Sequence, residues 1–114
     1  MFNDPQDPNQ YTWHMVIEYL RFDVPSDKRS AFLVADAAIW TASLSQYPGF
    51  IGKETWLDQT TGHIVTLLRW QTLEAWKSIP QADLDAIDAR MGDMQMPIVE
   101  ARALLPVSDI DSGS

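Results

Sequence analysis

The elements predicted from this sequence indicate an α+β domain with the ferredoxin-like order β-α-β-β-α-β. Four segments are rich in aromatic and β-branched residues or alternate apolar with polar residues, as strands do: residues 13–22, 50–57, 63–70 and 97–107. Two longer segments repeat apolar residues every three or four positions, as helices do. We therefore expect a four-stranded antiparallel sheet in the order 4-1-3-2, with both helices on one face.

The first strand, "WHMVIEYLRF" at residues 13–22, is apolar at both alternating sets of positions and is interrupted by one acid, Glu18. A strand with two apolar faces must be covered on both of them. The helices cover only one face of the sheet, so we expect a second copy of the chain to cover the other face through a two-fold axis. The expected assembly is a homodimer.

A helix of about 20 residues follows this strand, because apolar side chains recur at helical spacing over residues 32–47. Ser26 is the expected N-cap, and Asp27 is an acid at the position where the helix dipole favours one. The proline and glycine at residues 48–49 are expected to end the helix.

The segment "GFIGKETW", residues 49–56, begins the second strand, and the turn "DQTTG" joins it to the third strand as a hairpin. Gly52 predicts a β-bulge or a close backbone approach. Glu54 and Trp56 share one face of this strand, whereas Lys53 points to the other. The strand lies at the edge of the expected sheet, where a lysine discourages pairing with other chains.

The second helical region, residues 72–92, contains Pro80, which predicts a break or a kink. Gly92 is the expected C-terminal cap. The segment "PIVEARALLPV" then returns to two-residue alternation as the fourth strand.

The chain of 114 residues is expected to form a single domain over residues 13–107. Residues 1–12 are rich in proline, asparagine, glutamine and aspartate, which predicts a flexible arm. The small and acidic residues 108–114 predict a disordered tail.

The composition argues against several classes of function. Sixteen acidic and eight basic residues give a net charge of −8, which repels phosphate backbones, so we expect no nucleic-acid partner. The absence of cysteine excludes disulfides, thiolate metal sites and cysteine nucleophiles. No segment has the roughly 18 apolar residues needed to span a bilayer, and the first residues do not resemble a secretory signal. We therefore expect no membrane partner and a cytoplasmic location.

Several motifs resemble the antibiotic biosynthesis monooxygenase-like family of the dimeric α/β barrel superfamily. They are the Pro-Gly-Phe at 48–50 after a long first helix, the hairpin, and Trp70 leading into a helix that starts with Glu74 and Ala75. More narrowly, "VIEYLRF", "GFIGKETW" and "RWQTLEAWKSIP" resemble an uncharacterised, mostly cyanobacterial branch. The resemblance covers residues 13–106. It implies a pocket between helices and sheet, and cofactor-free oxidation of polyphenolic rings.

A related group in that superfamily degrades haem with an asparagine on the first strand, a tryptophan on the third and a histidine on the second helix. Trp70 corresponds to the tryptophan, but Glu18 stands where the asparagine is expected, and residues 72–91 contain no histidine. The resemblance therefore implies neither haem nor another cofactor.

We take Glu18, Arg69 and Trp70 as candidate catalytic residues. An ionised Glu18 amid apolar neighbours is costly unless it is paired, and Arg69 lies on the strand expected to be adjacent. Glu18 is either a buried general base with a raised pKa or one half of a structural salt bridge with Arg69. Sequence alone leaves both open, because it does not show which face of the third strand Arg69 occupies.

Glu54, Trp56 and Trp76 are candidates for the wall of a ligand pocket. The chain has five tryptophans, which either stack on a small aromatic ligand or belong to the core and the dimer interface. The charges on the strands, which include Glu54, similarly either line a pocket or form ion pairs between subunits. His14 and His63 lack a third ligand at metal spacing, so we expect no metal.

Two classes of function follow from these observations. The first is an enzyme, a cofactor-independent monooxygenase that acts on small aromatic compounds. The alternative is a non-catalytic dimer that binds a small ligand or has a structural role. The fold does not choose between them.

Overall fold

The computed structural model describes residues 14–107. The predicted arm at 1–12, the start of the first strand at Trp13 and the predicted tail at 108–114 lie outside the described residues.

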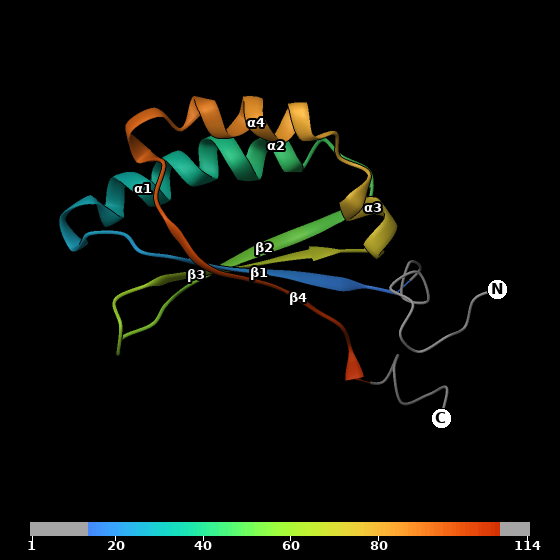
Figure 1. Cartoon of the computed structure of the whole chain (residues 1–114), viewed down its shortest axis with the longest axis horizontal. Coiled ribbons are helices and arrows are strands. Elements are labelled where there is room, and N and C mark those ends of the chain that lie inside the picture. Colours follow the sequence, from blue (N-terminus) through green and yellow to red (C-terminus); the bar gives the residue numbers. More distant parts are fainter. Residues whose placement is uncertain (1–13, 108–114) are drawn as a thin grey trace.

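Four antiparallel strands form one sheet in the order β2-β3-β1-β4, as predicted (Figure 1). The strands are β1 (Val16–Phe22), β2 (Phe50–Leu57), β3 (Ile64–Trp70) and β4 (Ile98–Leu104). The pairing of β2 with β3 shifts register between Phe50 and Gly52, which confirms the bulge predicted there. This edge strand therefore bends where glycine leaves room for it.

The first helical segment is continuous from Ser26 to Leu44, close to the predicted length. It consists of a 3-10 turn (Ser26–Lys28), α1 (Arg29–Asp36), a π-helical turn (Ala37–Thr41) and α2 (Ala42–Leu44). The prediction that Ser26 is the N-cap is wrong. Pro25 takes the cap position with its fixed φ of −55°, so Ser26 already lies in the first turn and its side chain caps nothing.

The second helical region is broken at Pro80, as predicted. It forms α3 (Leu73–Lys77) and α4 (Gln81–Arg90), with Pro80 at the N-cap of α4. Gly92 follows α4 with a φ of 53°, the left-handed conformation that commonly ends helices at glycine.

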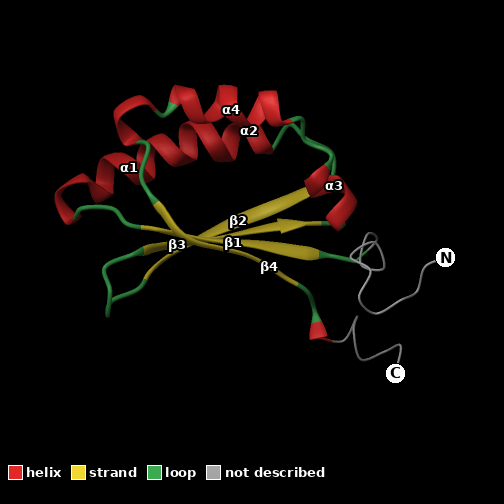
Figure 2. Ribbon diagram, in the orientation of Figure 1, coloured by secondary structure: helices red, strands yellow, loops and turns green. Residues whose placement is uncertain are grey.

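The helices α1, α2 and α4 lie over one face of the twisted sheet (Figure 2). Two groups of buried residues form the core between these layers, one around Trp70 and Leu44 and one around Phe32 and Ile64. Among residues 14–107, no helix covers the opposite face of the sheet. None of the helices described is both long and apolar enough to cross a membrane.

Candidate functional site

A cavity of about 200 Å³ lies between the helices and the sheet. Its polar lining on the sheet side comes from Glu18 of β1, Lys53 of β2 and Thr66 of β3. Exposed residues near the end of α4 and the start of β4, including Asp88 and Gln95, also line it, so the cavity opens to solvent on that side. The cavity is large enough for a small ligand and combines an apolar lining with a few polar groups, as ligand sites do.

Glu18 is half-buried on the helix-facing side of β1, and burial is the main cause that raises the pKa of its carboxyl above 4.5. The indole N–H of Trp70 and the ammonium groups of Lys77 and Lys53 oppose this rise, in that order. Among the described residues, no cation lies within ion-pair distance of Glu18. A carboxyl with a raised pKa, close to a cavity, is suited to accept a proton from a bound ligand.

Two buried polar groups on β3 make no hydrogen bond in the described part of the chain. Thr66 is 1% exposed and Trp70 is fully buried, yet Thr66 Oγ1 and Trp70 Nε1 both lack a partner in hydrogen-bond geometry. The Trp70 N–H nevertheless lies close enough to Glu18 to stabilise its charged form. Because an unsatisfied buried donor costs free energy, the Thr66 hydroxyl favours a ligand that carries an oxygen acceptor.

A buried ion pair connects α1 on one side of the cavity to β2 on the other. Lys53 Nζ of β2 contacts Asp36 Oδ2 at the end of α1, and the two side chains are only 6% and 8% exposed. Both residues line the cavity. Lys53 lies on an edge strand, as predicted, but its side chain runs inward beneath the helix.

Asp36 and Thr66 were not predicted as site residues. Asp36 lies four positions after Phe32 and four before Trp40, so it is an acid within the apolar stripe of a helix. An acid in such a stripe could have identified Asp36 as a site candidate. Nothing in the sequence distinguishes Thr66, because threonine is common in strands.

Aromatic side chains form much of the rest of the lining. Trp40 lies in the π-helical turn, a feature that often marks functional sites, and Trp76 comes from α3. Lys77 Nζ lies 4.2 Å from the centre of the Trp76 ring. Trp70 and Trp76, both predicted as site residues, thus lie on the cavity with Glu18.

Three predicted site residues lie on the opposite face of the sheet. Glu18 is opposite Leu68 in the β1–β3 register, so the next residue, Arg69, points away from it. Arg69 Nη2 instead donates to Glu54 Oε1 over 3.0 Å. The predicted pairing of Glu18 with Arg69 is therefore wrong. Glu54 and Trp56 share that outer face, as the alternation predicted, and do not line the cavity.

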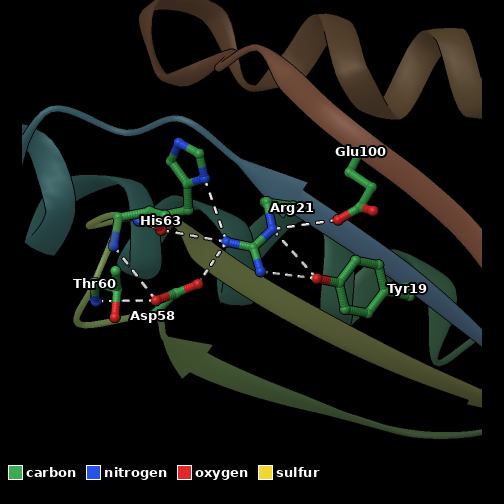
Figure 3. Close-up of polar contacts among 7 residues, drawn as sticks. Tyr19, Arg21, Asp58, Thr60, His63 and Glu100 are labelled. Atoms are coloured by element: carbon green, nitrogen blue, oxygen red, sulfur yellow. Dashed lines mark hydrogen bonds and ion pairs between the residues drawn. The ribbon is translucent and has the colours of Figure 1, made fainter.

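A second polar cluster centres on Arg21, also on the outer face (Figure 3). Arg21 donates to Asp58 Oδ2 at 2.8 Å, to Tyr19 Oη at 3.0 Å and to Glu100 Oε1 at 3.3 Å. The hydrogen bond from Arg21 is the main cause that lowers the pKa of Asp58. Because Asp58 starts the hairpin turn and Glu100 lies on β4, the cluster ties three parts of the sheet together and leaves Arg21 no obvious role in binding a ligand.

No group of three or more histidine, cysteine, aspartate or glutamate side chains that could hold a metal ion occurs among residues 14–107. The cavity is lined by aromatic rings, by apolar side chains and by six polar residues, which are Glu18, Asp88, Thr66, Gln95 and the ion pair of Lys53 with Asp36. Such a set can bind a small ring compound and move a proton.

Comparison with known proteins supports this fold. The chain resembles Rv0793 from Mycobacterium tuberculosis, with 21% identity over 81% of this chain and 94% of that one and a TM-score of 0.58. It resembles MupZ from Pseudomonas fluorescens, with 13% identity over 87% and 78% of the two chains and a TM-score of 0.65. It also resembles SnoaB, a cofactor-independent oxygenase from Streptomyces nogalater, with 17% identity over 82% of this chain and 91% of that one and a TM-score of 0.54.

These identities are low, so the structural likeness establishes the fold alone. No curated protein sequence matches the chain at a significant level. The family profile described as antibiotic biosynthesis monooxygenase matches residues 15–83, which is more than half of the sequence. The chain therefore belongs to the antibiotic biosynthesis monooxygenase family.

Proposed function

We propose that this protein is a cofactor-independent oxygenase that converts phenols of one or two rings into quinones with molecular oxygen. The observation that carries the proposal is the Glu18 carboxyl, which lines the cavity, has a raised pKa and has no ion-pair partner within residues 14–107. Membership of the monooxygenase family and the likeness to SnoaB, a cofactor-independent oxygenase, support the same reaction class.

The size of the cavity sets the size of the substrate. A cavity of about 150 Å³ lined by apolar side chains holds one benzene molecule. The cavity here is about 200 Å³, and Trp40, Trp70 and Trp76 supply flat apolar walls. A ring system of one or two rings fits these dimensions. The Thr66 hydroxyl, which has no hydrogen-bond partner in the described part of the chain, favours an oxygen substituent on it.

The reaction needs no reductant besides the substrate. Glu18 accepts the proton of the phenol hydroxyl, and the electron-rich phenolate reduces dioxygen. A carbon–oxygen bond forms at the ring carbon para to the hydroxyl, and the oxygen–oxygen bond breaks. The second oxygen leaves as water with the hydroxyl proton and the hydrogen of that carbon. One phenol and one O₂ thus give one quinone and one water.

Oxygen uptake with 1-naphthol as the probe tests the proposal. We expect the wild-type protein to consume one O₂ per 1,4-naphthoquinone formed, with one atom of ¹⁸O₂ in the quinone. Glu18→Gln should reduce the rate by about 100-fold or more, the size of a general-base contribution. Glu54→Gln is the matched control, because it removes an acid from the outer face of the sheet and should leave the rate unchanged.

One outcome would contradict the oxygenase, and another would contradict the role of Glu18 in it. Saturable binding of 1-naphthol without oxygen uptake would favour the alternative, a non-catalytic protein that binds small ligands. Equal rates for the wild type and Glu18→Gln would remove Glu18 from the reaction.

We further propose that the protein acts as a homodimer through the outer face of the sheet. This face carries apolar side chains, among them Ile17, Leu67 and Trp56, and Trp56 is 58% exposed in the single chain. The ion pair of Arg69 and Glu54 is already formed within one chain, so charge does not prevent a second copy from packing there. An apolar sheet face of this kind is typical of a protein interface.

Analytical ultracentrifugation over a range of micromolar concentrations tests the dimer. We expect a species of twice 12.9 kDa, and Trp56→Glu should shift it toward monomer, because it places a charge in the interface. Val34→Glu is the control, since Val34 is 71% exposed on α1, away from the sheet. A wild-type monomer throughout would contradict this assembly.

A further inference from the structure

We propose that Lys53, held in place by Asp36, binds the negative charge that develops on the para side of the bound phenol, opposite Glu18. This inference rests on the proposed function and adds a second catalytic residue to it, together with a preference for oxidation at the para carbon. Asp36 is a positioning residue, because it acts through Lys53.

The sheet register places the two groups on either side of one apolar residue. Glu18 is opposite Leu68 in the β1–β3 pairing, and Lys53 is opposite the same Leu68 in the β2–β3 pairing. All three side chains face the helices and line the cavity. Neighbouring strands are about 4.8 Å apart, so the Cα atoms of Glu18 and Lys53 are about 10 Å apart. A ring lying over Leu68 has an acid near one end and an ammonium group near the other.

The burial of the ion pair is costly and calls for an explanation. Two charges taken out of water are often no more stabilising than apolar residues of the same size. Lys53 and Asp36 nevertheless keep side chains that are 6% and 8% exposed, and they do so on the wall of a cavity. A cation held at a known point, with its own side chain largely shielded from water, is suited to stabilise charge as it develops.

The ammonium group of Lys53 acts on a group inside the cavity. Among the groups that act on the Glu18 carboxyl, Lys53 stabilises the charged form, as Lys77 does more strongly. Lys77 is exposed on α3 beside the Trp76 ring, outside the row that contains Leu68. An anion bound over Leu68 would lie nearer to Lys53 than the Glu18 carboxylate does. Lys53 would therefore attract that anion more strongly than it attracts Glu18.

The ionisation of bound 4-nitrophenol tests the inference separately from oxygen chemistry. Its phenolate shares negative charge between the hydroxyl oxygen and the para nitro group, and it absorbs visible light. The titration is carried out in the Glu18→Gln protein, so that Glu18 does not titrate alongside the probe. We compare this protein with one that also carries Lys53→Met and Asp36→Leu, which removes the pair and leaves no unpartnered buried charge.

We expect the acid dissociation constant of bound 4-nitrophenol to be about tenfold higher with Lys53 present than in the variant without the pair. Lys53→Arg in the Glu18→Gln protein keeps the cation and should retain most of this difference. The control, Glu54→Gln with Arg69→Gln, removes an ion pair from the same two strands on the outer face and should have no effect. Urea denaturation confirms that each variant is folded.

The outcomes separate this inference from the proposed function. Saturable binding with the same ionisation in both proteins would overturn the role of Lys53 and leave the oxygenase intact. No saturable binding of 4-nitrophenol to the wild type or to the Glu18→Gln protein would overturn the aromatic site, and the role of Lys53 with it.

Discussion

Glu18 and Lys53 lie in one row of the sheet, on either side of Leu68, with both side chains beneath the helices. Lys53 is paired with Asp36, whereas Glu18 has no ion-pair partner among the described residues. We therefore expect that replacing Glu18 raises the free energy of unfolding, whereas replacing Lys53 alone lowers it.

Replacing Glu18 with Gln should stabilise the protein at neutral pH. The folded-state pKa of Glu18 is raised above 4.5, so the folded protein holds this proton more tightly than the unfolded chain. Stability therefore falls as pH rises from about 4.5 through the raised pKa. Glu18→Gln lacks this loss, and we expect a gain of up to about 1 kcal/mol in the free energy of unfolding at pH 7.

Urea denaturation at a fixed protein concentration measures this gain. The difference between the two proteins should narrow as pH falls below about 4.5, where the carboxyl is protonated in both states. A loss of stability at pH 7 would instead indicate a buried partner for the carboxylate.

Replacing Lys53 alone should destabilise the protein strongly. Lys53→Met leaves Asp36 buried without its cation, which typically costs about 3–5 kcal/mol. The double variant with Asp36→Leu should recover most of the loss, because two apolar side chains of similar size replace the pair. Urea denaturation of the single and double variants checks this, and additive losses would show that the two side chains do not interact.

Gly49 should tolerate no side chain. Its φ is 90°, and a Cβ atom there would lie 2.5 Å from Ala75 Cβ. Gly49→Ala therefore combines backbone strain with a clash between the turn before β2 and α3, and we expect a loss of more than about 3 kcal/mol.

Gly62→Ala is the matched control for that substitution. Its φ is 78°, but a Cβ atom would meet no other atom within 4 Å. The loss should be about 1 kcal/mol, from backbone strain alone. Equal losses at the two glycines, measured by urea denaturation, would show that the contact with Ala75 relaxes without cost.

Asp58→Asn should lower the melting temperature modestly at pH 7. The pKa of Asp58 is lowered from 3.8, mainly by the hydrogen bond from Arg21, so this carboxylate stabilises the folded state above pH 3.8. That stability is lost as pH falls through the lowered pKa, and the two proteins should then converge. Asp85→Asn is the control, because the hydrogen bond that the structure shows for Asp85 comes from Gln81 within α4 and involves no cation. A gap that persists unchanged at low pH would contradict the role of the charge.

The course of the chain was predictable because it depends on local patterns. The second strand was predicted at residues 50–57 and is observed at Phe50–Leu57. Pro80 broke the second helical region as expected, since proline removes a backbone donor wherever it lies. The prediction of an N-cap at Ser26 was wrong for a local reason too, because Pro25 occupies that position.

The contents of the site were predictable only in part. Glu18, Trp70 and Trp76 were recognised as unusual residues and do line one cavity. Arg69, Glu54 and Trp56 were equally plausible by residue type, yet they lie on the other face. A shift of one position along a strand reverses the face, and no local pattern on β3 indicates which one is covered by helices.

The fold class, the order of the elements and the acid on an apolar strand could all be predicted from the sequence, since all three depend on residues close together in the chain. The partners of the charged side chains became known only from the folded chain. Lys53 meets Asp36 across 17 positions, and Arg69 meets Glu54 across a hairpin. These contacts depend on strand register and on the height of the helix above the sheet, and both are set by packing of the whole core. For that reason Glu18 could be singled out from the sequence, whereas its place opposite Leu68 and across from Lys53 could not.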